Sequence, residues 1–212
     1  MSLNILSGTL AFPDPTLADE NGLVAIGGDL SIERLLLAYQ CGIFPWYSEN
    51  EPICWWSPDP RFVLFPSELK ISKSMRTVIN KGSFKFTINR AFREVIRHCK
   101  ESLRDGKPGS WINEAMIGAY TQLHQLGYAH SAEAWSNGQL VGGLYGIRQG
   151  NIFFGESMFS KVSNASKFAL INYIQLLKLE GVSLIDCQFY TSHLESLGAT
   201  MITRKKFLLH LQ

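Results

Sequence analysis

The chain has 212 residues, of which 46% are hydrophobic and 18% charged, and its formal net charge is +2. This composition is sufficient for a folded core and excludes a disordered chain, while the length fits one domain or two small ones. No stretch is long and apolar enough to span a membrane, and the first residues lack a signal-peptide pattern, so we expect no membrane association.

The first 60 residues are rich in proline and glycine, which favours short elements joined by turns. Leu23–Ile26 is an expected strand. Ser31 is an expected N-cap for a helix over Ile32–Gln40, and Gly42 lies just beyond the end of that helix.

The tryptophan-rich stretch before Arg61 has no regular period. We place a domain boundary there, with a small N-terminal α/β domain at residues 1–61 and a larger domain at residues 62–212. In the larger domain, strands are expected at Phe62–Phe65, Phe84–Ile88, His130–Trp135, Gln139–Ile147, Asn151–Met158 and Val182–Phe189. Helices are expected at Ser72–Asn80, Ala91–Ser102, Asn113–Leu126, Asn164–Leu179, His193–Leu197 and Lys205–Leu211.

The second half of the larger domain contains a strong hairpin pattern, with Asn137 and Gly138 between two apolar runs. The long helix that follows can return the chain, so that Val182–Phe189 lies parallel to a neighbouring strand. This order predicts an α/β fold with a mixed α+β sheet, in which the larger domain is acetyltransferase-like (GNAT-like).

The charges are distributed unevenly along the chain. Residues 1–60 contain one basic and eight acidic side chains, whereas residues 61–107 contain twelve basic and four acidic ones. Such a basic segment is typical of a surface that binds a polyanion such as nucleic acid. Solvated helix faces are the alternative interpretation.

Polar side chains interrupt two apolar strands. Asp186 and Gln188 share one face of their expected strand, and Glu156 lies among aromatic residues next to Gly155. A carboxylate is costly to bury unless it is paired, so these residues are candidates either for a site or for satisfied structural contacts. If the two strands are neighbours, the three polar groups converge, and two carboxylates in an aromatic setting suit the binding of a cation.

Aromatic and glycine residues add two further patterns. Four tryptophans lie in segments that resemble loops, and beside a basic segment they favour a platform on which bases stack: Trp46, Trp55, Trp56 and Trp111. The expected strand Gln139–Ile147 contains three glycines, Gly142, Gly143 and Gly146. They indicate either tight packing with a bulge or a backbone that closely approaches an acyl group.

Familiar catalytic motifs are absent from the sequence, including the nucleophile elbow, the phosphate-binding loop and the dinucleotide fingerprint. The histidines and the four cysteines do not have the spacing of metal ligands, and we expect no metal site. Free thiols without an export pattern indicate the reducing cytoplasm.

The chain resembles the leucyl/phenylalanyl-tRNA–protein transferases over most of its length. The matching segments are Asn21-Gly22-Leu23, Gly27-Gly28-Asp29-Leu30, Gly42-Ile43-Phe44-Pro45-Trp46, Trp55-Trp56-Ser57-Pro58-Asp59-Pro60-Arg61, Trp111-Ile112, Gly155-Glu156-Ser157-Met158-Phe159-Ser160, Asn164-Ala165-Ser166-Lys167 and Leu184-Ile185-Asp186-Cys187-Gln188. The resemblance implies transfer of Leu or Phe, with Met as a minor donor, from aminoacyl-tRNA to the N-terminal Arg or Lys of proteins. It implies that the product is marked for degradation and that no metal or coenzyme is used.

The resemblance also implies roles for individual residues. Trp46 and Trp111 match residues of the aminoacyl-adenosine site, while Phe153, Leu144 and Leu177 match the lining of the amino-acid pocket. Well-known members of the family have Met and Phe at the last two positions. The polar residues assigned to acceptor binding and catalysis match Glu156, Asp186 and Gln188.

The expected mechanism needs neither a nucleophile nor ATP, because the donor ester is already activated. We expect Asp186 to orient Gln188, Gln188 to accept from the attacking amine, and Glu156 to hold the cationic acceptor. Asp186 as a base, acting directly or through water, is the rival. We expect alanine at Asp186 to lower turnover by orders of magnitude while leaving the thermal melt nearly unchanged.

Contacts to tRNA phosphates are assigned to four basic residues, Arg76, Lys81, Lys85 and Arg90. Two other functions remain open. One is a coenzyme-A-dependent N-acyltransferase, although the segment after Met158 lacks the pyrophosphate-loop pattern. The other is a non-catalytic RNA-binding module.

Overall fold

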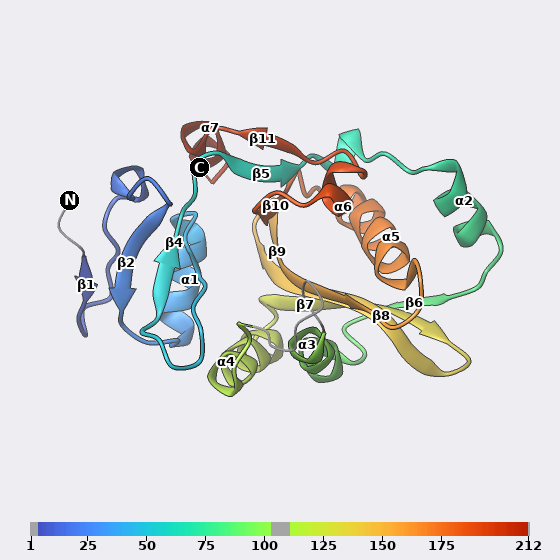
Figure 1. Cartoon of the computed structure of the whole chain (residues 1–212), viewed down its shortest axis with the longest axis horizontal. Coiled ribbons are helices and arrows are strands. Elements are labelled where there is room, and N and C mark those ends of the chain that lie inside the picture. Colours follow the sequence, from blue (N-terminus) through green and yellow to red (C-terminus); the bar gives the residue numbers. More distant parts are fainter. Residues whose placement is uncertain (1–3, 103–110, 212) are drawn as a thin grey trace.

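The computed structural model describes residues 4–102 and 111–211 (Figure 1). Within these ranges the strands form a four-stranded sheet of order β1-β2-β4-β3 and a seven-stranded sheet of order β11-β5-β10-β9-β8-β7-β6. The strands are β1 (Ile5–Leu6), β2 (Leu23–Gly27), β3 (Phe44–Pro45), β4 (Cys54–Trp56), β5 (Arg61–Leu64), β6 (Lys85–Ile88), β7 (Ala129–Ser136), β8 (Gln139–Gln149), β9 (Ile152–Ser160), β10 (Leu184–Gln188) and β11 (Thr200–Ile202). The mixed α/β class is confirmed.

Helices cover both faces of the large sheet. The α-helices are α1 (Ile32–Gln40), α2 (Lys73–Asn80), α3 (Phe92–Glu101), α4 (Glu114–Gln125), α5 (Ala165–Leu179), α6 (Ser192–Glu195) and α7 (Arg204–Leu209). Two 3-10 turns occupy Pro15–Leu17 and Pro66–Glu68. Helices α3 and α4 pack on one face of the large sheet, α5 packs on the other face with α2 against it, and α1 packs on the small sheet and reaches α4 (Figure 1).

Local sequence patterns account for most of these elements. The side chains of Ser72 and Asn113 accept the hydrogen bonds that cap α2 and α4, as expected. Ser31 precedes α1 as predicted, but its side chain makes no capping bond. The short strands β1, β3, β4 and β11 were not predicted, because two or three residues are too few to show alternation.

The tryptophan-rich stretch corrects one expectation. Trp55 lies in strand β4 rather than in a loop, and its side chain is fully buried in the core. Trp56 belongs to the same strand, and its indole N–H donates to the carbonyl oxygen of Trp46 at 2.6 Å. Two of the four tryptophans therefore serve the packing of the small sheet.

Glycines at two places permit close packing. A Cβ atom on Gly142 would lie 2.6 Å from the Cβ of Ala165, so this glycine lets the start of α5 approach β8. At Gly146 a Cβ would lie 2.1 Å from the carbonyl oxygen of Phe154. The packing interpretation of this glycine-rich strand is therefore confirmed for these two positions.

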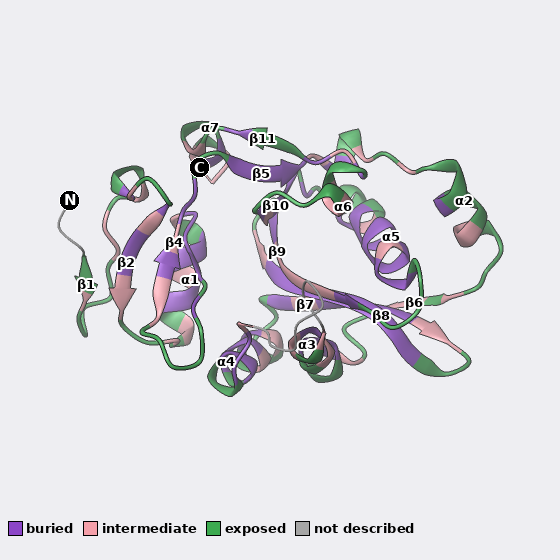
Figure 2. Ribbon diagram, in the orientation of Figure 1, coloured by how far each residue is buried: buried purple, intermediate pink, exposed green. Residues whose placement is uncertain are grey.

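The core is continuous between the two sheets (Figure 2). One cluster of buried residues joins Ala25 and Tyr39 of the N-terminal part to Tyr120 and Tyr145 of the large lobe. Near the C-terminus, Arg204 donates to the carbonyl oxygen of Ser57 at 2.6 Å. The domain boundary near residue 61 stays a prediction. None of the helices in the described ranges has the length and apolarity to cross a bilayer.

Candidate active site

The site lies where strands β9 and β10 separate. These strands pair in parallel, as expected, and the last pair joins Asp186 to Phe154. Beyond that pair both strands carry an irregularity. Glu156 is the extra residue of a bulge in β9, because Tyr145 pairs with Ser157 and Gly146 with Gly155. Bulges commonly redirect side chains beside active sites.

Strand β10 has a matching irregularity. Asp186 faces Val63 and Gln188 faces Phe62, which leaves Cys187 as the extra residue. The backbone of Gln188 adopts a positive φ of 58°. Together the two irregularities bring Gln188 and Glu156 together, and the Nε2 atom of Gln188 donates to Oε1 of Glu156 at 3.3 Å.

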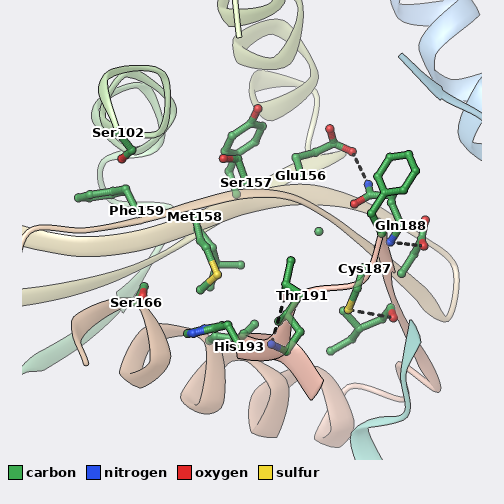
Figure 3. Close-up of a pocket in the computed structure, with 18 of the residues that line it drawn as sticks. Ser102, Glu156, Ser157, Met158, Phe159, Ser166, Cys187, Gln188, Thr191 and His193 are labelled. Carbon is green, nitrogen blue, oxygen red and sulfur yellow. Dashed lines mark hydrogen bonds between the residues drawn. The ribbon is translucent and has the colours of Figure 1, made fainter. Parts of the chain in front are cut away.

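A cavity of about 1000 Å³ opens at this point (Figure 3). Glu156 and Gln188 face each other at one end of the view, and Ser102 and Phe159 lie toward the other end. The cavity is lined by seven of the eight residues assigned to catalysis and substrate binding, namely Trp46, Trp111, Leu144, Phe153, Glu156, Asp186 and Gln188. The expected place of Leu177 in the pocket lining is corrected, because this residue is buried in the core and does not line the cavity.

Asp186 forms a buried ion pair with Arg61. The Nε and Nη2 atoms of Arg61 donate to the two carboxylate oxygens at 2.8 and 2.6 Å, and both side chains are fully buried. The guanidinium also lies over the rings of Phe44 and Phe207, 4.8 and 4.5 Å from their centroids. The charge of Asp186 is therefore compensated within the protein.

This ion pair changes the expected role of Asp186. Its Oδ1 atom accepts the backbone N–H of Gln188 at 3.0 Å, so Asp186 fixes the backbone of Gln188 and not its side-chain amide. Both oxygens of the Asp186 carboxylate are already hydrogen-bonded to the guanidinium of Arg61. Of the two carboxylates expected to bind a cation, Asp186 is therefore already paired. Glu156 forms no ion pair with a basic side chain of the described residues.

Glu156 accepts hydrogen bonds from two hydroxyl groups, which come from helices α1 and α4, far apart in the sequence. Its Oε1 atom accepts from Tyr39 at 2.7 Å and its Oε2 atom accepts from Tyr120 at 3.2 Å. Burial raises the pKa of Glu156 to about 7, and the charge of Asp186 adds to this, while the tyrosine hydrogen bonds act in the opposite direction. The group therefore titrates near neutrality.

Aromatic rings form one wall at the mouth of the cavity. The side chain of Trp46 is 41% exposed, and its ring lies 5.3 Å from the ring of Phe189. The centroid of the Phe44 ring lies 5.8 Å from that of Phe189. Trp46 is therefore accessible for stacking, whereas Trp55 and Trp56 pack within the small sheet.

Comparison with known proteins identifies the family. The sequence model described as "Leucyl/phenylalanyl-tRNA protein transferase" matches residues 63–212, and the model of its N-terminal domain matches residues 28–59. The chain is 56% identical to the leucyl/phenylalanyl-tRNA–protein transferase of Syntrophobacter fumaroxidans, over 96% of this chain and 87% of that protein. It is 58% identical to the protein of that name from Flavobacterium johnsoniae, over 94% of both chains.

The chain belongs to the leucyl/phenylalanyl-tRNA–protein transferases. The expected resemblance is confirmed, and the chain is an aminoacyltransferase rather than a coenzyme-A-dependent enzyme or a non-catalytic RNA-binding module. Among solved structures, a GCN5-related N-acetyltransferase from Kribbella flavida aligns with a TM-score of 0.40 and 8% identity, over 78% of this chain and 58% of that one. A likeness this distant carries no argument about the site.

The four basic residues assigned to tRNA are exposed and lie outside the cavity. Arg76 is on α2, Lys81 follows that helix, and Lys85 begins β6. Arg90 lies over the ring of Trp135, 5.5 Å from its centroid. The basic side chains that line the cavity are different ones, contributed by His98, Lys161 and His193. A role for the four residues in tRNA binding stays a prediction.

Three residues of the transferase site were not predicted from the sequence. Arg61, Tyr39 and Tyr120 are fully buried and contact Asp186 or Glu156. The sequence pattern around the carboxylates pointed to these residues only indirectly. A carboxylate within an apolar strand requires a partner, but the pattern does not say which residue that is. Within the described ranges, no group of three or more potential metal-ligating side chains lies together.

The stability of the transferase is expected to fall as pH rises from about 4.5 to about 7, relative to the Glu156→Gln variant. The folded-state pKa of Glu156, about 7, lies above the ordinary value of 4.5. Between these values the folded state binds more protons, so the contribution is full below the unfolded-state pKa and is lost as pH rises through the folded-state pKa. Denaturant unfolding of both proteins between pH 4.5 and 7 measures the difference in their free energy of unfolding. A difference that does not change with pH would contradict the prediction.

Proposed function

We propose that the transferase moves Leu or Phe, with Met as a minor donor, from aminoacyl-tRNA to the N-terminal Arg or Lys of an acceptor protein, and that the product is marked for degradation. The observation that carries this proposal is that apolar side chains and Glu156 line the same cavity. The apolar wall suits the donor side chain, and the carboxylate suits a cationic acceptor.

The donor site is proposed to be the apolar part of the cavity. Its lining includes Leu144, Phe153, Met158, Leu170 and Ile185. Trp46 and Trp111 offer rings to the terminal adenine, since base stacking on an aromatic ring contributes about 1–3 kcal/mol. The pocket should admit Leu and Phe and disfavour the β-branched Ile and Val, with a selectivity of about 1–3 kcal/mol per methyl group.

The acceptor site is proposed to lie between Glu156 and Gln188. Nε2 of Gln188 donates to Glu156. The Oε1 atom of Gln188 is therefore left to accept an N–H of the attacking amine. The amine nitrogen attacks the ester carbonyl, loses one proton and forms the peptide bond, while the ribose oxygen leaves and gains a proton. A neutral amide orients the amine rather than deprotonating it, and holding the amine next to the ester carbonyl contributes to the acceleration.

Residues 1–61 are proposed to act as a small N-terminal domain that contributes one wall of the site, with residues 62–212 as the aminoacyl-transfer domain. The break between the two sheets, after Trp56 and before Arg61, supports this division. The small part contributes Phe44 and Trp46 to the cavity and Tyr39 to the contacts of Glu156.

Transfer of labelled Leu or Phe from charged tRNA to a peptide that begins with Arg tests the proposed function. A matched peptide that begins with Ala is the control. Label on the Arg peptide alone is the expected result. Equal labelling of both peptides would contradict the proposed acceptor preference, and label on neither would contradict the proposed function as a whole.

The double change Lys81→Ala and Lys85→Ala is expected to weaken tRNA binding and to reduce its dependence on salt. If each lysine contacts one phosphate, the slope of log affinity against log salt falls by about 2 in magnitude. Filter binding at several salt concentrations measures the slope. Lys178→Ala, which changes an exposed lysine near the end of α5, is the matched control. An unchanged slope in the double variant would remove these lysines from the tRNA contact.

A further inference from the structure

Three oxygen-bearing groups, of which Glu156 lines the cavity, contact one another pairwise. The hydroxyl of Tyr39 contacts Oε1 of Glu156, and the hydroxyl of Tyr120 contacts Oε2. The two hydroxyls also contact each other at hydrogen-bond range, and either of them can be the donor. Both tyrosine side chains are fully buried, so their hydroxyls find these partners within the protein.

The number of protons decides whether this arrangement is satisfied. Three oxygen–oxygen contacts need three protons, and the two tyrosine hydroxyls supply one each. If Glu156 is ionised, one contact places two oxygen lone pairs against each other. If Glu156 is protonated, its proton completes a closed ring in which each group donates once and accepts at least once.

The position of the third proton follows from the remaining contact. Oε1 of Glu156 already accepts from Tyr39 and from Nε2 of Gln188, whereas among the described residues the hydrogen-bond partner of Oε2 is the hydroxyl of Tyr120. The proton therefore belongs on Oε2. Oε2 donates to Tyr120, Tyr120 donates to Tyr39, and Tyr39 donates back to Oε1.

We propose that Tyr39, Tyr120 and Glu156 form a closed ring of three hydrogen bonds that holds a proton on Glu156 in the empty site and releases it when a cationic acceptor binds. Tyr39 and Tyr120 are then positioning residues, since they act through Glu156 and do not line the cavity themselves. The release step rests on the proposed function, because it needs a cationic acceptor beside Glu156.

The charged groups around the ring favour the proton in the empty site. Burial of Glu156 is the largest influence on its pKa and raises it, and the charge of Asp186 on β10 raises it further. Arg61 on β5 lowers the pKa of Glu156, but this guanidinium is already paired with Asp186. Tyr47 is the further titratable group that faces Tyr120. A docked ammonium or guanidinium adds an uncompensated positive charge and favours the ionised carboxylate.

The closed ring and two independent tyrosine donors predict opposite effects of Tyr120→Phe on the pKa of Glu156. If the hydroxyls only donate to an ionised carboxylate, Tyr120→Phe removes a donor and raises the pKa of Glu156. In the ring, the same change removes the acceptor of the Glu156 proton and relieves the contact between lone pairs in the ionised form. The ring therefore predicts that Tyr120→Phe lowers the pKa, by about one unit.

Infrared difference spectroscopy as a function of pH tests the ring without any substrate. The carbonyl band of a protonated carboxylic acid should disappear near neutral pH in the wild type, and Glu156→Gln should remove that band. In Tyr120→Phe the loss should occur at lower pH, and Tyr39→Phe should shift it in the same direction. If Tyr120→Phe does not fold, Tyr39→Phe provides the test. Tyr173→Phe, which changes a buried tyrosine outside the ring, is the control and should leave the midpoint unchanged. A midpoint that rises in the ring variants would overturn the proposal.

Calorimetry in buffers with different ionisation enthalpies tests the release step. Binding of a peptide that begins with Arg should release up to one proton near neutral pH in the wild type and none in Glu156→Gln. The change to Gln preserves the ring, because its amide N–H can donate to Tyr120 in place of the acid proton. Binding without proton release in the wild type would overturn the release step. Absence of peptide binding would instead count against the proposed acceptor site, and the infrared result would still decide whether the ring exists.

Discussion

Alanine at Asp186 is expected to destabilise the transferase strongly, with a loss of about 3–5 kcal/mol and a fall in melting temperature of roughly 10 °C. The physical reason is Arg61, whose fully buried guanidinium loses the carboxylate that binds it through two hydrogen bonds. Thermal unfolding of the purified variant measures the effect. The sequence alone predicts an unchanged melt, whereas the buried ion pair predicts this loss. An unchanged melting temperature would contradict the prediction made from the ion pair.

A double variant separates stability from catalysis at this position. Arg61→Met combined with Asp186→Leu replaces the buried pair by apolar side chains, which is often neutral or stabilising. We expect the double variant to regain most of the lost melting temperature and to remain inactive, because the backbone N–H of Gln188 no longer has its carboxylate acceptor. Recovery of transfer activity together with stability would show that Asp186 serves the fold alone.

Shortening Gln188 by one methylene is expected to lower kcat by about 100-fold, the effect of a displacement near 1 Å at a reacting group. Gln188→Asn keeps the amide and tolerates the positive φ of this position, but withdraws the amide from Glu156. Single-turnover transfer to an Arg peptide measures the rate. Gln175→Asn, on an exposed position of α5, makes the same chemical change away from the site and should have no effect. A Gln188→Asn enzyme with normal kcat would remove Gln188 from the reaction.

Much of the fold follows from local sequence, because the forces that start and stop its elements act over a few residues. Ser72 and Asn113 cap their helices through their own side chains, and Asn137 adopts the positive φ that a tight hairpin turn needs. The return of the chain through α5 into a parallel strand also follows from element order. The very short strands could not be predicted, because they exist only through pairing with distant partners.

The candidate site divides in a similar way. Glu156, Asp186 and Gln188 can be recognised in the sequence because each places a polar group inside an apolar strand. The family could also be recognised from the sequence, because the resemblance is confirmed by the family models and by relatives more than 50% identical. The charges and hydrogen bonds around each group, in contrast, depend on contacts that form only on folding. Arg61 reaches Asp186 from an adjacent strand, and Tyr39 and Tyr120 reach Glu156 from two helices far apart in the chain. The charge and the proton of a buried carboxylate depend on the groups that replace water around it, and neighbours brought together by folding leave no local pattern in the sequence.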